Sequence, residues 1–172
     1  MKKFFTHSSC LHIFTMRSKT LAVLGLAMLL SVKGFSQNYT VTSTIDGHAT
    51  NQLRGAIEAS DAAGGTHIIT VNPGVYTLTL GEITFGNTAQ NITINGAGAA
   101  STIISMTTGA GKDRIFFINP SGTTNSPVIT VSGLTFQNGS LTSDPFGGAA
   151  ICAGGGSAES LTITNCIFNN NI

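Results

Sequence analysis

The stretch Ile92-Thr93-Ile94-Asn95 alternates apolar and polar residues, and the same pattern returns along the chain. The other copies are Ile69-Thr70-Val71-Asn72, Ile129-Thr130-Val131-Ser132 and Leu161-Thr162-Ile163-Thr164. Alternation with a period of two predicts a strand with one buried face. Successive copies are offset by 23, 37 and 32 residues, a spacing typical of solenoids in which each coil covers its neighbour. The sequence therefore predicts an all-β fold, a single-stranded parallel β-helix.

The two later copies also agree beyond the first strand. Leu134-Thr135-Phe136-Gln137-Asn138 aligns with Cys166-Ile167-Phe168-Asn169-Asn170. We expect Phe136 and Phe168 to occupy one column of the core. The apolar residues of the repeated strands should likewise point inward and stack from coil to coil. These residues are Ile69, Val71, Ile92, Ile94, Ile129, Val131, Leu161 and Ile163.

The composition fits a solenoid. Charged residues make up only 9% of the chain, Trp is absent and Gly occurs 21 times. Asn and Gly suit corners that need a positive φ angle, and the high content of β-branched residues argues against disorder. The longer polar stretches 107–113 and 139–146 are expected to be loops that leave the coils.

Residues 1–36 have the pattern of a cleaved export signal, with Met16 as an alternative start. Arg17 and Lys19 precede the apolar run 21–30, which is too short for a membrane-spanning helix, and Gly34 and Ser36 frame a cleavage site before Gln37. The alternative is a buried core helix. After cleavage, Arg54, Lys112 and Arg114 remain against seven acidic residues, a net charge of −4. Such a chain has no basic stripe for nucleic acid.

Residues 37–66 are expected to cap the N-terminal end of the solenoid, whose coils would occupy 67–172. A helix is predicted with Thr50 or Asn51 as its N-cap, and Gly64-Gly65 should end it. Its apolar face contains Leu53, Ala56, Ile57 and Ser60. The repeat at 160–172 has no polar cap after it, so we expect further coils beyond Ile172.

Three segments resemble known β-helix proteins. Asn51-Gln52-Leu53-Arg54-Gly55-Ala56-Ile57 resembles the Leu-Arg-x-Ala-Ile opening of bacterial surface β-helix proteins. The segment 92–104 is similar to an early coil of the pectate-lyase-like right-handed parallel β-helices. Gly147-Gly148-Ala149-Ala150-Ile151 and Phe168-Asn169-Asn170-Asn171 resemble repeats of chlamydial polymorphic outer membrane proteins. The resemblance implies a right-handed β-helix at the cell surface and leaves its activity open.

Candidate catalytic residues are sparse. Asp113 and Arg114 belong to the only mixed charge cluster, and in a polysaccharide lyase Arg114 could neutralise a sugar carboxylate. A solvated loop is the alternative. Ca²⁺ could take that part in a lyase, but it requires several convergent oxygens, and the acidic residues show no spacing that gathers them. Gly96-Ala97-Gly98 is followed by a predicted strand, so it predicts a corner and no nucleotide site.

Cys152 and Cys166 would meet oxidising conditions after export. They either form a disulfide or serve as two small core residues. His48 and His67 do not fit zinc spacing with either cysteine. The sequence predicts no resident metal or cofactor.

Two functions follow from these observations. The first is an exported, non-catalytic stalk or adhesin on the surface of a Gram-negative-type bacterium. It would bind glycan or a host surface and associate with the outer membrane through a further C-terminal region. The second is a polysaccharide lyase or hydrolase whose active site lies in coils beyond Ile172.

Overall fold

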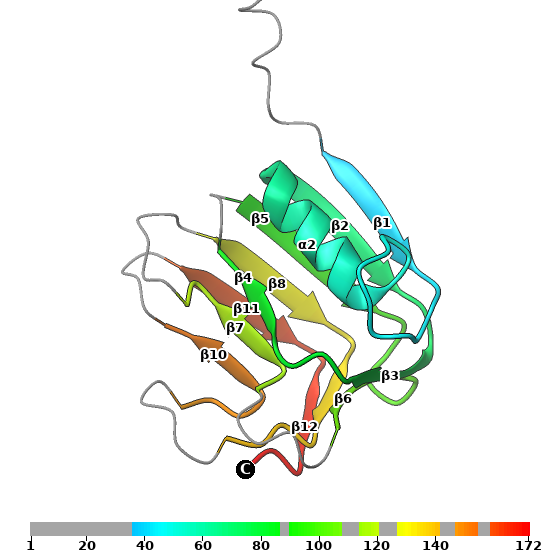
Figure 1. The fold of residues 1–172 in the computed structure, drawn as a ribbon, viewed down its shortest axis with the longest axis vertical. Helices are drawn as coiled ribbons and strands as arrows, with labels where there is room; N and C mark the ends of the chain where they lie inside the picture. Colours follow the sequence, from blue (N-terminus) through cyan, green and yellow to red (C-terminus); the bar gives the residue numbers. More distant parts are fainter. Residues whose placement is uncertain (1–35, 87–89, 108–113, 121–126, 142–146, 155–158) are drawn as a thin grey trace, which may run out of the picture. The chain divides into compact units, whose positions relative to one another are not determined.

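The computed structural model describes residues 36–86, 90–107, 114–120, 127–141, 147–154 and 159–172. Within these ranges the strands form three parallel sheets (Figure 1). The first sheet, in spatial order, contains β1 (Gln37–Val41), β2 (Gly65–Val71), β5 (Gln90–Gly96), β8 (Val128–Ser132) and β11 (Ser160–Thr164). The second contains β3 (Gly74–Leu78), β6 (Thr102–Met106), β9 (Thr135–Gln137) and β12 (Ile167–Asn169). The third contains β4 (Ile83–Phe85), β7 (Phe116–Ile118) and β10 (Ile151–Ala153).

The chain visits the three sheets in a fixed cycle. β2, β3 and β4 lie in the first, second and third sheet, and β5 to β7 and β8 to β10 repeat this order. Every strand pairs in parallel with its counterpart in the next coil, such as β5 with β8. The predicted all-β parallel β-helix with an N-terminal helix is confirmed.

The register between coils agrees with two of the three predicted offsets. Ile92 pairs with Ile129, and Ile129 pairs with Leu161, as the repeats indicate. Phe136 also pairs with Phe168. The first offset is wrong by two residues, because Ile69 pairs with Ile94, 25 residues away, and Ile92 pairs with His67. A shift of two residues keeps every side chain on its own face of the sheet, so the error does not change which residues are predicted to point inward.

The core consists of columns that run from coil to coil. The repeated inward residues of β2, β5 and β8 are at most 1% exposed; they are Ile69, Val71, Ile92, Ile94, Ile129 and Val131. Phenylalanine rings continue the packing, with centroids 5.2 Å apart for Phe85 and Phe116 and 5.3 Å for Phe116 and Phe136. Phe168 stacks on Phe136 at 5.3 Å, and the two ring planes differ by 16°.

The same columns are only partly covered in the last described coil. Leu161 packs against the core, whereas Ile163 is 38% exposed and Phe168 is 47% exposed. β11 and β12 are edge strands of their sheets. No described strand therefore covers their outer side, although their register is that of the buried columns.

The corners use the residues that tolerate a positive φ angle. Gly133 has a φ of 65°, and Asn165, in the matching position of the next coil, has a φ of 53°. Asn138 and Asn170 form a second such pair, and the amide of Asn170 donates to the Asn138 side-chain oxygen at 2.9 Å. Adjacent coils also touch at a corner, because a Cβ on Gly96 would overlap the Gly133 carbonyl. The sequence prediction for these corners is confirmed.

The helix α2 (Leu53–Ala63) contacts β1, β2 and β4. Leu53, Ala56, Ile57 and Ser60 are buried, as the helical pattern indicates. The predicted N-cap is wrong: Gln52 holds that position, with extended backbone and no side-chain cap. Its side chain instead turns back, and its Oε1 accepts a hydrogen bond from the Ala49 amide at 3.0 Å. Gly64, with a φ of 65°, ends the helix.

Several sequence predictions fall outside the described residues. The leader 1–35 does so, and so do most of the two expected loops, at 108–113 and 142–146. Among the described residues, no helix is long and apolar enough to cross a membrane.

The packed rings of Phe85, Phe116, Phe136 and Phe168, called the phenylalanine ladder here, generate a stability prediction with an internal control. Phe136→Ala should lower the free energy of unfolding by about 3–5 kcal/mol, because it removes a fully buried ring between two coils. Phe168→Ala, in the same column but 47% exposed, should cost clearly less. Urea denaturation followed by circular dichroism measures both values. Equal losses for the two variants would show that the ladder does not organise the core.

Candidate functional site

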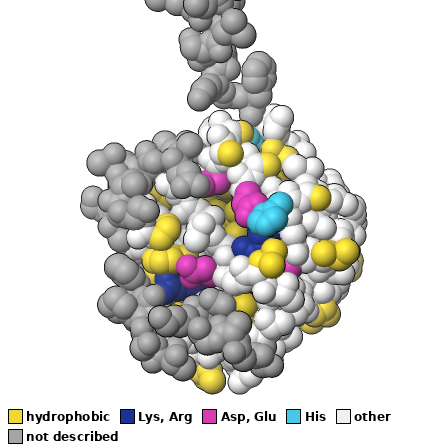
Figure 2. Space-filling model, viewed as in Figure 1, with side chains coloured by type: hydrophobic (Ala, Val, Ile, Leu, Met, Phe, Trp, Pro, Cys, Tyr) yellow, Lys and Arg dark blue, Asp and Glu magenta, His cyan; other side chains and the backbone are white. Residues whose placement is uncertain are grey.

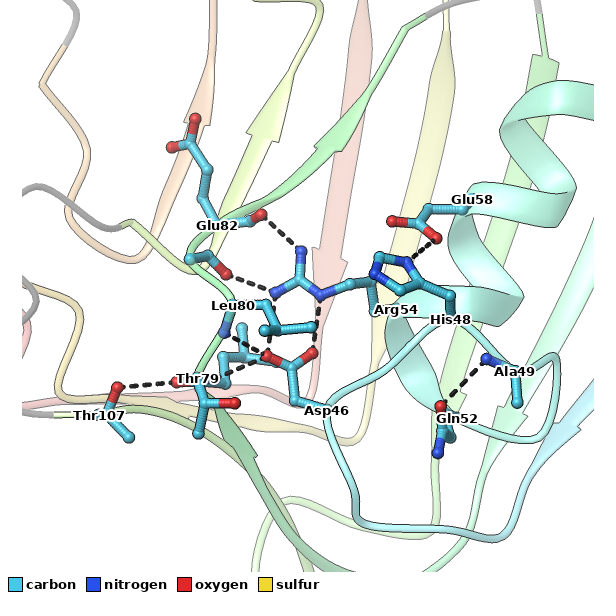
Figure 3. A network of polar contacts seen from close by, with 12 residues as sticks. Asp46, His48, Ala49, Gln52, Arg54, Glu58, Thr79, Leu80, Glu82 and Thr107 are labelled. Carbon is cyan, nitrogen blue, oxygen red and sulfur yellow. Dashed lines mark hydrogen bonds and ion pairs between the residues drawn. The ribbon is translucent and has the colours of Figure 1, made fainter.

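The most extensive polar network that the structure describes centres on Arg54, at the start of α2 (Figure 3). The guanidinium Nε donates to Asp46 Oδ1 at 2.7 Å and Nη2 donates to Asp46 Oδ2 at 3.2 Å. Both side chains are almost completely buried. A bidentate arginine–carboxylate pair of this kind is stronger than an ordinary hydrogen bond and fixes the orientation of both groups.

The pair also satisfies the main chain of the connection between β3 and β4. Arg54 donates to the carbonyl oxygens of Gly81, at 2.5 Å, and Glu82, at 2.8 Å. Asp46 Oδ2 accepts from the amides of Thr79, at 2.6 Å, and Leu80, at 2.8 Å. Figure 3 shows the two side chains lying between α2 and this connection.

The backbone groups on either side of this connection show which hydrogen bonds the Asp46–Arg54 pair replaces. The Leu78 carbonyl accepts from the Thr107 amide, and the Ile83 amide donates to the Ile115 carbonyl, so both bond to the following coil. The four groups between them are the amides of Thr79 and Leu80 and the carbonyls of 81–82, and they bond instead to the ion pair. Buried backbone donors and acceptors need such partners. Asp46 and Arg54 therefore act in place of a preceding coil.

This environment changes the acidity of Asp46. Burial alone raises the pKa of the Asp46 carboxyl, but hydrogen bonds from Arg54 and from the Leu80 and Thr79 amides outweigh it. The net result is a pKa below the ordinary value for aspartate. The carboxylate is thus held in its charged form, which suits a structural anion and does not suit a general base near neutral pH.

The sequence candidates Asp113 and Arg114 have different outcomes. Asp113 lies outside the described residues. Arg114 is only 1% exposed, its Nε lies 3.4 Å from Glu82 Oε2, and its guanidinium carbon lies 3.9 Å from the Phe117 ring centroid. Glu82 thereby joins two arginines, through its carbonyl to Arg54 and through its carboxylate to Arg114. In this arrangement Arg114 is buried and packs against Phe117 of the third sheet.

The remaining described acids also have polar partners. Glu58 lies 2.7 Å from His48 in an exposed pair. Asp61 is buried and accepts from the Gly86 amide at 2.9 Å and from the Gln90 side chain. Glu159 accepts from the Asn119 amide group at 3.4 Å. Among the described residues, no three His, Cys, Asp or Glu side chains gather in a way that could hold a metal ion.

The two cysteines are not joined by a disulfide. Cys152 lies in β10 of the third sheet, whereas Cys166 precedes β12 of the second sheet. Cys166 packs against the core, in line with its alignment to Leu134. His67 is fully buried, and its two ring nitrogens contact Gln37 and the Gly64 carbonyl. It is a core histidine with satisfied hydrogen bonds.

Sequence reasoning missed the pairing of Asp46 with Arg54. The available signal was the Leu53-Arg54-Gly55 segment, in which an arginine interrupts an apolar helix face. Gly55 belongs to the same arrangement, because a Cβ there would overlap the backbone of His48 and Ala49. The close approach brings the turn that carries Asp46 onto the helix.

On the face seen in Figure 2, the described charged side chains form small groups among hydrophobic side chains and side chains of other types. Such a surface can contact a neutral partner by hydrogen bonding over several coils. It provides little electrostatic attraction for a polyanion.

The buried pair predicts a pH-dependent loss of stability. Asp46→Asn should destabilise the protein by about 3 kcal/mol at neutral pH, since it leaves the Arg54 charge buried without its counterion. A carboxyl with a lowered folded-state pKa contributes stability above its unfolded pKa of about 3.9 and loses it at lower pH. The difference between wild type and variant should therefore shrink in acid, as urea denaturation at a series of pH values would show.

Glu58→Gln is the matched control. Its carboxylate lies in an exposed pair with His48, so the change should cost less than about 1 kcal/mol. A loss as large as that of Asp46→Asn would contradict the role assigned to the buried pair.

Comparison of the chain with models of known protein families, with curated proteins and with solved structures finds no match.

Proposed function

We propose that the chain is an exported, non-catalytic β-helix that acts as a surface stalk or adhesin and binds glycan or another cell surface. The export pattern at 1–36 and the resemblance of 51–57, 147–151 and 168–171 to bacterial surface β-helix proteins support the destination. The repeated coils support a scaffold, since each coil adds surface without changing the fold.

One observation carries the non-catalytic part of the proposal. All five acidic side chains that the structure describes have a polar partner within the protein. Two of them, Asp46 and Asp61, are buried in contacts that bind one part of the fold to another. Hydrolysis of a glycosidic bond uses two carboxyl groups that flank it, one of them able to give up a proton near neutral pH. Asp46 and Asp61 instead serve as structural anions.

The binding part follows from the solenoid's surface. Outward-facing residues of the described strands are largely Thr, Ser and Asn, which donate and accept hydrogen bonds as sugar hydroxyls do. An extended array of such groups suits a repetitive neutral partner, with many weak contacts adding to a useful affinity.

The proposal predicts an absence of turnover. The chain should release neither unsaturated nor reducing ends from pectin, alginate or chondroitin, with or without added Ca²⁺. Ultraviolet absorbance and a reducing-sugar assay measure the two products. Turnover abolished by Asp113→Asn would overturn the proposal and establish the alternative, a polysaccharide-degrading enzyme. Turnover that survives the change would also refute it and place the catalytic groups elsewhere.

Export predicts a processed N-terminus. When the gene is expressed in a Gram-negative host, the exported protein should begin at Gln37 or within two residues of it, because the small residues before Gln37 fit a signal-peptidase site. Edman sequencing of the exported fraction provides the measurement. Recovery of Met1 or Met16 from that fraction would show that the leader is retained.

A further inference from the structure

The outward face of the first sheet carries three columns of side chains, two of which run through all five strands. The parallel register aligns Asn38, Ile68, Thr93, Thr130 and Thr162 in one column. It aligns Thr40, Thr70, Asn95, Ser132 and Thr164 in the other. Nine of these ten positions carry a hydroxyl or an amide, and six of them are threonine. We call these ten residues the threonine face.

The threonine face is open on its outer side. Thr40, Thr70, Thr162 and Thr164 are exposed, and Thr93 and Thr130, in the middle of the sheet, are partly exposed. Their inward neighbours on β5 and β8 are at most 1% exposed. α2 packs on the inner side, where Leu53, Ala56 and Ile57 join the core cluster. The helix therefore leaves this face uncovered.

The spacing of the face is set by the backbone. Neighbouring parallel strands lie about 4.7–4.9 Å apart, and alternate residues of one strand lie about 6.6 Å apart. The side chains therefore form a two-dimensional lattice, and its repeat across the strands is close to a repeat between water oxygens in hexagonal ice. Threonine is stiff at χ1, so its hydroxyl and methyl groups are held in place before any ligand arrives. Binding then costs little side-chain entropy.

The chemistry of the face also suits ordered water. A hydroxyl can donate and accept, as a lattice water does. Within the column, Ser132 Oγ already donates to Asn95 Oδ1 at 2.8 Å, so one such bond joins β5 and β8. The described outward positions of the first sheet include no charged residue, which would keep its own hydration shell. They also include no aromatic ring on which a sugar could stack.

From this geometry we propose that the threonine face binds ice. The columns hold a layer of water in lattice positions, and this layer joins the surface of an ice crystal. The activity goes beyond the scaffold role, and the two proposals fail separately, because inhibition of ice growth requires no glycan.

Inhibition of ice recrystallisation in a frozen sucrose solution tests the proposal on the full chain. Wild type should keep the ice grains small. Thr130→Lys, at the centre of the face, should require an about tenfold higher concentration for the same effect, as expected when a central contact of an interface is lost. Thr162→Lys, on the edge strand β11, changes the same column at a more exposed position and should also weaken inhibition.

Thr77→Lys is the matched control, because Thr77 is an exposed outward residue of β3 in the second sheet. It should inhibit as wild type does, and circular dichroism should show the same fold for all variants. Wild type without effect on the grains would overturn the proposal. So would equal inhibition by Thr77→Lys, Thr130→Lys and Thr162→Lys. Binding of wild type to crystalline cellulose, lost in Thr130→Lys and without inhibition of ice growth, would overturn it and assign the face to a glycan.

Discussion

The parallel, in-register pairing of successive coils is the constraint on which the other features of this solenoid depend. Once β5 pairs with β8 in a fixed register, every inward side chain lies directly on its counterpart in the next coil. Like then packs on like, which produces the isoleucine and valine columns and the stacking of Phe168 on Phe136. The outward columns follow from the same pairing, since alternate residues of one strand cannot change face independently. The same register therefore determines both the stacking of the buried side chains and the columns of side chains on the surface.

A structure built in this way meets a difficulty at its first coil, because β3 and β4 are edge strands and no described strand precedes them in their sheets. The chain solves it with two side chains: the carboxylate of Asp46 stands in for two backbone acceptors, and the guanidinium of Arg54 stands in for two backbone donors. A charged pair suits this place because it offers several hydrogen bonds in a small volume. Its burial carries a desolvation cost that only complete bonding can offset. Gly55 belongs to the same solution, since it lets the turn approach the helix closely enough for the pair to form.

Residue patterns predicted the fold well because the same alternation of apolar and polar residues recurs in successive coils. Alternation located the strands, and the Leu134–Asn138 and Cys166–Asn170 segments gave the correct register for the last two coils. The first register could not be read in this way. His67 occupies a core position there and Gly96 pairs with Val71, so apolar matching favoured a slip of two residues that preserves alternation. The Asp46–Arg54 pair was equally hidden, because its partners at 79–82 are backbone groups, which leave no mark on the sequence.

The distance along the chain between paired strands of the first sheet is not constant. Ile69 and Ile94 are 25 residues apart, Ile92 and Ile129 are 37 apart, and Ile129 and Leu161 are 32 apart, yet each pair is directly opposed. The length of the segments between strands therefore does not affect the core. Evolution can lengthen these segments without disturbing any column of buried side chains. Two such proteins could share every buried position and still align poorly from end to end. Among related proteins of this kind, the spacing of inward-facing residues within each strand therefore indicates common ancestry better than an end-to-end sequence alignment does.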